Sequence, residues 1–129
     1  MKYICLGYYD KSKHEGMTQG EQESMIDSFF EYDEHLRANG HWVGGEAIQS
    51  SETALTLYWK DDKVATTDGP FAETKEQLGG ILFLEARDMN QAIQLMAQHP
   101  SIKYGSIWDI RPVGDLDEML KESDLRRRK

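Results

Sequence analysis

The sequence predicts an α+β fold of the ferredoxin-like type (βαββαβ), in which two helices cover one face of an antiparallel sheet. The apolar pattern runs strand, helix, strand, strand, helix, strand, with one extra hairpin inserted in the middle. Gly and Pro residues stand where these elements should end. The chain has 129 residues, which allows one domain and hardly two.

The first half of this pattern is a strand followed by a long helix. Residues 2–9 are apolar and aromatic, which is typical of a buried strand. Residues 18–39 carry an apolar stripe at helical spacing with acids on the opposite face, and Gly40 suits the residue that ends a helix. The stripe comprises Met25, Ile26, Phe29, Phe30 and Leu36, and Asp33 is its one polar interruption.

The middle of the chain reads as strands and turns. Residues 41–48 predict a short strand bent at a Gly-Gly pair. Residues 53–60 and 64–67 predict a hairpin, because Thr, Leu, Tyr and Trp favour strands and a polar tip separates the two segments. Asp68-Gly69-Pro70 predicts a turn, and residues 73–77 predict one helical turn.

The last third predicts a strand over residues 78–86 and then a second helix. Asp88 is expected to cap this helix and Pro100 to stop it. Residues 104–113 alternate as a strand does. We therefore expect one domain over residues 1–113 and a C-terminal tail, 114–129, that includes a short helix.

A sheet with two helices on one face leaves its other face bare. The strand aromatics are too many for the helix side alone, and an uncovered apolar face is typical of an interface or a pocket wall. The sequence therefore predicts a homodimer formed by sheet-on-sheet packing. The aromatics are Tyr3, Tyr8, Tyr9, Tyr58, Trp59, Phe83, Tyr104 and Trp108.

The charge argues against several classes of partner. The chain has 23 acids and 15 bases, a net charge of -8, whereas a nucleic-acid binder carries a basic face. Residues 18–39 hold six acids against Arg37 alone, so much of the acidity belongs to one helix. No apolar run approaches the roughly 20 residues that a membrane span needs. With one cysteine and no signal-peptide pattern, we expect a cytoplasmic protein that binds neither nucleic acid nor membrane.

The densest group of polar side chains surrounds the turn at Asp68. Pro70 stiffens the turn, so Asp68, Glu73 and Lys75 can point into one cleft. A carboxylate beside an ammonium group at a pocket mouth can bind a polar ligand or move a proton. The alternative is that Asp68 satisfies backbone N–H groups in the turn and that the charges after it are solvated.

Two further side chains are candidates from their position. His35 lies on the acidic helix and could act as a base, or it is an ordinary surface histidine. Glu46 follows the Gly-Gly bend and either faces the cleft or is an exposed strand residue. No pair of histidines has metal-ligand spacing and no phosphate-binding loop occurs, so we expect no metal and no cofactor. Cys5 lies mid-strand and is expected to be a structural thiol.

The run Asp68–Gly80, DGPFAETKEQLGG, resembles the signature of the DGPF branch of the YCII-related (YciI-like) family. The resemblance extends over nearly all of residues 1–113. It includes Tyr3, Tyr8-Tyr9, Leu36–Gly40, Gly44–Ala47, Glu85–Asp88, Gly105–Ile107 and Arg111–Val113.

The resemblance implies a dimeric α/β barrel without a settled function. One branch of the family is thought to use a His–Asp pair in a cleft, and one relative takes part in dechlorination of an aromatic substrate. The family histidine stands early in the first helix, where this chain has Phe29, so His35 does not inherit its role. DGPF proteins also resemble domains attached to or encoded beside sigma factors, which implies a sigma factor as a partner.

Three hypotheses follow. The first is a small-molecule binding or regulatory homodimer, with a ligand held near the turn. The second is a cofactor-independent enzyme that performs elimination or isomerisation on a ring, with Asp68 as acid or base and His35 as helper. The third is an assembly module whose barrel interior is filled. The expected ligand-binding residues are Tyr8, Glu46, Asp68, Phe71, Glu73 and Lys75.

Overall fold

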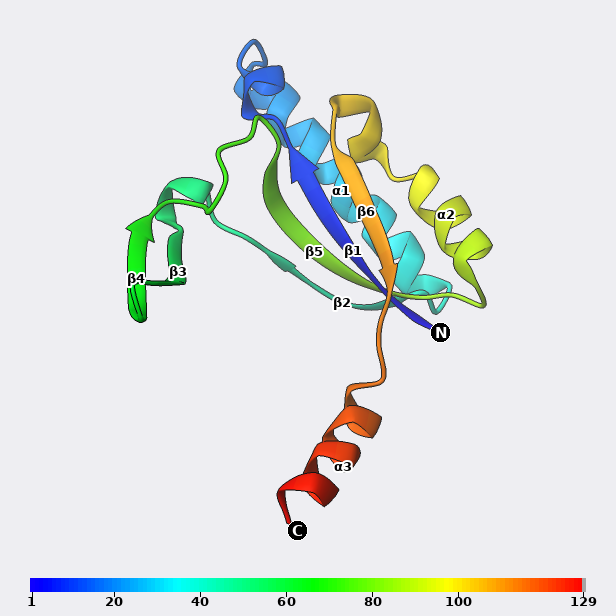
Figure 1. Cartoon of the computed structure of the whole chain (residues 1–129). Helices are drawn as coiled ribbons and strands as arrows, with labels where there is room; N and C mark the ends of the chain where they lie inside the picture. The colour runs from blue at the N-terminus through cyan, green and yellow to red at the C-terminus, as the bar shows by residue number, and fades with distance from the viewer. Residues whose placement is uncertain (129) are drawn as a thin grey trace.

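The computed structural model describes residues 1–128 and is an α+β fold (Figure 1). Nine helices and strands of this range follow one another along the chain, together with three 3-10 turns. The strands are β1 (Lys2–Tyr9), β2 (Trp42–Ala47), β3 (Leu55–Lys60), β4 (Lys63–Asp68), β5 (Gln77–Glu85) and β6 (Ile107–Pro112). The helices are α1 (Gln19–Ala38), α2 (Met89–Ala97) and α3 (Leu116–Arg127), and the 3-10 turns are η1 (Lys11–His14), η2 (Ser51–Thr53) and η3 (Pro100–Tyr104).

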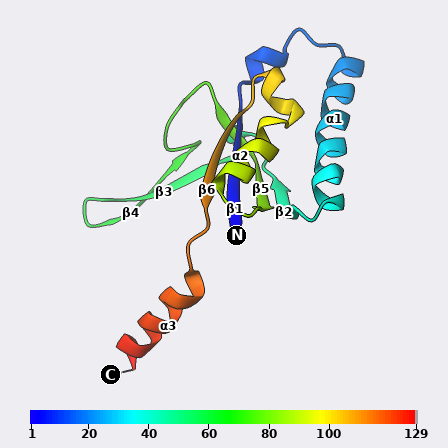
Figure 2. The same ribbon diagram turned by 90° about the vertical axis from the view of Figure 1, so that its right-hand side faces the viewer.

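Four strands form one antiparallel sheet in the order β2-β5-β1-β6, and β3 pairs with β4 in a separate hairpin. Without the hairpin, the chain order and the strand order are those of the ferredoxin-like split βαβ arrangement, as predicted. α1 lies on one side of the sheet and the hairpin projects on the other (Figure 2).

Local sequence signals define the helix ends. The Thr18 hydroxyl accepts the Glu21 N–H at 3.1 Å and the Glu21 carboxylate accepts the Thr18 N–H at 3.1 Å, a capping box at the start of α1. Gly40, at φ 78°, follows the end of α1 in the left-handed region that favours glycine. Asp88 and Asp115 cap α2 and α3. The predicted helices are therefore confirmed.

The core lies between the helices and one face of the sheet. Alternate residues of β1 point into it. Residue 7 is a glycine because a Cβ at this position would lie only 2.8 Å from the nearest atom of the Trp108 ring. The buried cluster comprises Tyr3, Cys5, Leu36, Leu82, Leu84, Ala86, Ala92 and Met96.

Two sequence predictions are wrong in detail. Residues 73–76 are irregular, with bends at 75 and 76, and Gln77 already begins β5, because the Thr74 hydroxyl and the Gln77 amide bond to nearby backbone carbonyls instead of forming a helical turn. The last strand begins at Ile107 and not at 104, because His99 and Pro100 start a 3-10 turn that precedes it. No helix in residues 1–128 is both long and apolar enough to cross a membrane.

Candidate ligand-binding site

The face of the sheet opposite the helices carries apolar and charged side chains in register; we call it the open face. Tyr3 and Cys5 point into the core, so Ile4, Leu6 and Tyr8 point the other way. One row across the four strands reads Glu46, Ile81, Leu6, Asp109, and the next reads Gly44, Phe83, Ile4, Arg111. The open face thus has an apolar centre with a carboxylate at each edge.

Arg111 and Asp109 form a bidentate ion pair at the β6 edge, with N–O distances of 3.0 and 2.9 Å. The hydrogen bonds from Arg111 hold the pKa of Asp109 below its ordinary value. The Asp109 carboxylate in turn raises the pKa of Arg111, and the nearby Tyr8 side chain adds a smaller effect in the same direction. Both partners of the pair are accessible to water, so a ligand anion can replace Asp109 at the guanidinium at small cost.

Asp68 ends β4, and the turn that follows it does not depend on its carboxylate. Gly69, at φ 91°, donates its N–H to the Ala54 carbonyl at 2.8 Å, and the Thr56 hydroxyl donates to the Gly69 carbonyl at 2.8 Å. Within residues 1–128, no hydrogen bond to the Asp68 carboxylate is found. The carboxylate is exposed and free for another partner.

The residues after the turn run back to the sheet along the end of β1. Lys75 lies close enough to Asp10 to contribute to its lowered pKa, behind the larger effect of hydrogen bonds from Ser12. Glu73 is exposed and the Phe71 side chain is 90% exposed. Phe71, Glu73 and Lys75 are therefore all open to solvent in one chain.

His35 lies elsewhere. It is exposed on α1, where the centre of its ring lies 5.8 Å from the centre of the Tyr32 ring. Its backbone carbonyl accepts a hydrogen bond from the Asn39 side-chain amide at 2.8 Å. α1 and the hairpin that carries Asp68 lie on opposite sides of the sheet (Figure 2). His35 and Asp68 therefore do not share a cleft in one chain.

Sequence reasoning missed a buried polar network between α1, η3 and β6. The Trp108 indole N–H donates to the Ser101 hydroxyl at 2.8 Å, and this hydroxyl lies 2.7 Å from His99 Nδ1. His99 Nδ1 also accepts the Ser101 N–H, which assigns the ring proton to Nε2, 3.5 Å from Asp33 Oδ1. The sequence signal was Asp33, the one polar residue in the apolar stripe.

The network contains Ser, His and Asp side chains, but its serine is not an active nucleophile. Ser101 is 3% exposed and its oxygen already accepts the indole N–H, so no acyl carbon can approach it. His99 instead caps η3 through the Ser101 N–H. The network cross-links one helix, one turn and one strand inside the core.

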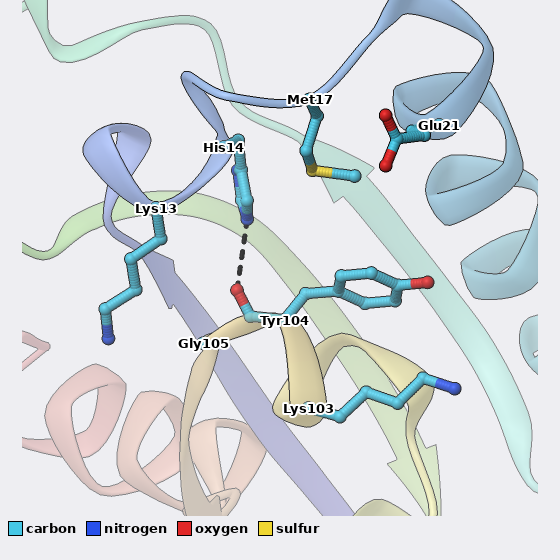
Figure 3. Close-up of a pocket in the computed structure, with 7 residues that line it drawn as sticks. All are labelled: Lys13, His14, Met17, Glu21, Lys103, Tyr104 and Gly105. Atoms are coloured by element: carbon cyan, nitrogen blue, oxygen red, sulfur yellow. Dashed lines mark hydrogen bonds between the residues drawn. The ribbon is translucent and has the colours of Figure 1, made fainter.

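Two shallow hollows lie on the molecule at the start of α1, beside η1 and η3. The larger, about 560 Å³, is drawn in Figure 3, where the His14 ring meets the Tyr104 carbonyl at 3.1 Å. Its neighbour, about 440 Å³, shares Met17, Glu21 and Tyr104. None of the predicted site residues lines either hollow. The lining of the larger hollow is Lys13, His14, Met17, Glu21, Lys103, Tyr104 and Gly105.

Residues 1–117 match the family model of the YCII-related domain, and the chain belongs to that family. It is 27% identical over 117 residues to the uncharacterized protein R00369 of Rhizobium meliloti (strain 1021), covering 88% of this chain and 92% of the relative. It is also similar to the structure of 5-chloro-2-hydroxyhydroquinone dehydrochlorinase (TftG) from Burkholderia phenoliruptrix AC1100, in complex with 2,5-dihydroxybenzoquinone. That match has 16% identity and a TM-score of 0.49, covering 92% of this chain and 98% of the other.

The resemblance to the YCII-related family is thus confirmed. Membership of its DGPF branch, the homodimer and the sigma-factor partner stay predictions, as do the roles of the six ligand-binding residues.

Proposed function

We propose that the protein is a homodimer that binds a small molecule on the open face of its sheet. The observation that carries this proposal is the composition of the open face. Ile4, Leu6 and Phe83 form its apolar centre, and charged side chains flank this centre at both edges. Ligand sites in proteins combine an apolar wall with a few convergent polar groups in the same way.

The dimensions suit a small ring compound. Neighbouring strands lie about 4.8 Å apart, so the outer strands β2 and β6 are separated by about 14 Å. A flat apolar ring covers Ile81 and Leu6 in the centre of this span, and polar substituents reach Glu46 on one edge and Arg111 on the other. We therefore propose a substituted aromatic compound as the class of ligand.

A second chain supplies the cover that one chain lacks. Small-molecule sites bury 70–90% or more of a ligand of roughly drug size, whereas a bare sheet face contacts only one side of it. Two open faces packed against each other lie about 10 Å apart and enclose the space between them. The proposed ligand site therefore depends on the proposed homodimer.

A thermal-shift screen tests this proposal with benzoate, salicylate, 4-hydroxybenzoate and catechol. Ligand at 100 times its Kd stabilises the protein by about 2.7 kcal/mol, which raises Tm by several degrees. We expect Glu46→Gln and Asp68→Asn to weaken the shift. Glu31→Gln is the matched control, because Glu31 is an exposed carboxylate on α1, outside the open face.

The absence of any shift across the panel, or equal shifts with wild type and Glu46→Gln, would contradict the ligand site. Consumption of a bound compound, followed by chromatography, would favour the acid–base enzyme instead, with the free Asp68 carboxylate as its acid or base. A mass of 14.9 kDa by light scattering at every concentration would contradict the homodimer.

A further inference from the structure

The hairpin of β3 and β4, which we call the arm (residues 55–68), has one face that is largely apolar, with Thr66 and Asp68 as its polar members. Strand register places Leu55, Leu57 and Trp59 on this face, with Val64 opposite Trp59. These four side chains are 60%, 64%, 69% and 63% exposed in that order. The other face carries Thr56, Tyr58 and Thr67, and the Thr67 hydroxyl bonds to the Tyr58 hydroxyl at 3.1 Å. The arm is thus amphipathic without a surface to cover it in one chain.

A two-stranded hairpin by itself is marginally stable in water, so an apolar arm of this kind depends on packing against another surface. At its base, the hydrogen bonds around Gly69 hold the two ends of the hairpin together. From there the arm projects on the side of the sheet away from α1 (Figure 2). The arm and the open face therefore belong to the same side of the molecule, and neither covers the other.

We propose that the arm of each chain packs by its apolar face on a second copy of the chain and closes the ligand site on that copy's open face. This inference rests on the proposed function. The partner is a second copy because the two surfaces are mutually suited: each chain offers an apolar arm and an apolar sheet face on one side. A two-fold axis pairs each arm with the other chain's face, so both are covered at once.

The lengths of the two surfaces agree. A strand of six residues spans about 20 Å, and the four strands of the sheet place their outer members about 14 Å apart. The arm is therefore long enough to reach from one edge of the partner's open face to the other, along the border of the contact between the two sheets. Lys60 and Lys63 at the tip lie on the other face of the arm, with Tyr58, so these two ammonium groups stay outside the proposed contact.

The arm also supplies what the ligand site lacks. A stable interface buries about 800 Å² on each partner. The side chains of the open face are already half-buried in one chain, so they have little further surface to bury. An aromatic side chain such as Trp59 contributes roughly 150–250 Å². Trp59 at the border of the partner's open face adds an apolar side chain to the enclosure of a bound ring.

Tryptophan fluorescence tests the inference directly. Trp42 and Trp108 pack against the core, whereas Trp59 is exposed in one chain. On dilution from dimer to monomer we expect the emission of the wild type to shift to longer wavelength and its quenching by acrylamide to increase. Trp59→Phe removes the only reporter on the arm, so in that variant the change on dilution should disappear.

A double substitution on the arm gives the second readout. We expect Leu57→Ser with Trp59→Ser to raise the dimer dissociation constant at least tenfold, as measured by light scattering over a dilution series. Tyr58→Ser is the matched control, because it removes an aromatic side chain from the opposite face of the same strand. Its dimer dissociation constant should stay within twofold of that of the wild type.

The outcomes separate the two proposals. A wild-type dimer in which acrylamide quenches Trp59 freely, and in which the double substitution changes nothing, overturns the arm and leaves the proposed function intact. A wild type that is monomeric at every concentration overturns both. If the double variant fails to fold by circular dichroism, the emission of wild type against Trp59→Phe still decides the question.

Discussion

The two faces of the four-stranded sheet differ in what covers them, whereas the central strands β1 and β5 are apolar on both faces. On the covered face Tyr3, Cys5 and Leu84 are fully buried beneath the helices. On the open face, Ile4 and Phe83 from the same strands are equally apolar, but remain half-buried. An antiparallel sheet with one face in water normally alternates apolar and polar residues. Strands that are apolar on both faces indicate that the second face is also meant to be covered.

Charge follows the same division. The acids of the first helix, six against Arg37 alone over residues 18–39, lie on the side of the molecule that α1 occupies. The chain's net charge of -8 therefore belongs largely to the helix side, away from the open face and the arm. The acids that remain on that side, Glu46, Asp109 and Asp68, are accompanied by bases such as Arg111, which limits the like-charge repulsion that opposes association.

Substitutions at neighbouring positions of β5 give the largest expected difference. Leu84→Ala removes a fully buried side chain and should lower the free energy of unfolding by about 2–5 kcal/mol, in urea, at any protein concentration. Phe83→Ala should cost less than half as much in dilute protein and more at high concentration, where the dimer forms. Equal losses at all concentrations would contradict the difference between the two faces.

The buried network tests whether the covered face also depends on polar contacts. Ser101→Ala leaves the Trp108 indole N–H and the His99 ring without the Ser101 hydroxyl and should lower the free energy of unfolding by about 1–3 kcal/mol. Ser12→Ala, whose hydroxyl bonds to Asp10 at the surface, is the control and should change the stability by less. If Ser101→Ala left the free energy of unfolding unchanged, the network would contribute nothing to stability.

Cys5 reports on the covered face through pH. Burial raises the pKa of its thiol from 9.0 to about 12, so the folded thiol stays neutral while the unfolded one ionises. The unfolded state then binds fewer protons, and stability falls by about 1.4 kcal/mol per pH unit above 9. Denaturation of wild type and Cys5→Ala at pH 8 and 10 measures this difference. If the difference in unfolding free energy between the two proteins were the same at pH 8 and pH 10, the burial of the thiol would be contradicted.

The smallest expected effect lies at the surface end of α1. Thr18→Ala removes one half of the capping box and should lower the free energy of unfolding by about 1 kcal/mol. Thr18→Ser keeps an acceptor for the Glu21 N–H and should restore most of the loss. The ligand-binding residues of the open face should not respond to either change.

The order of helices and strands follows from the sequence because each element has a local cause. These causes act within a few residues of where they stand. They are the apolar periodicity, the caps at Thr18, Asp88 and Asp115, and the glycines at 40 and 69. Residues 73–77 were mispredicted because side-chain bonds to the backbone compete with a helix, and propensity alone does not reveal which prevails.

The sites were harder to predict because their members are brought together over long sequence distances. Asp33 and His99 look unrelated along the chain, and only the packing of η3 against α1 makes them a pair. Glu46 and Asp109 became members of one row through the pairing of four strands. His35 was a candidate for its chemistry, and the tertiary structure placed it across the sheet from Asp68.

The sequence by itself determined the family, the ferredoxin-like order of elements and the existence of a sheet face without helices, because these depend on local periodicity and short motifs. The tertiary structure alone decided which side chains share that face and on which side the arm projects. The physical reason is register: a shift of one residue between paired strands turns every side chain to the opposite face, and the hydrophobic pattern of strands that are apolar on both faces does not determine that choice.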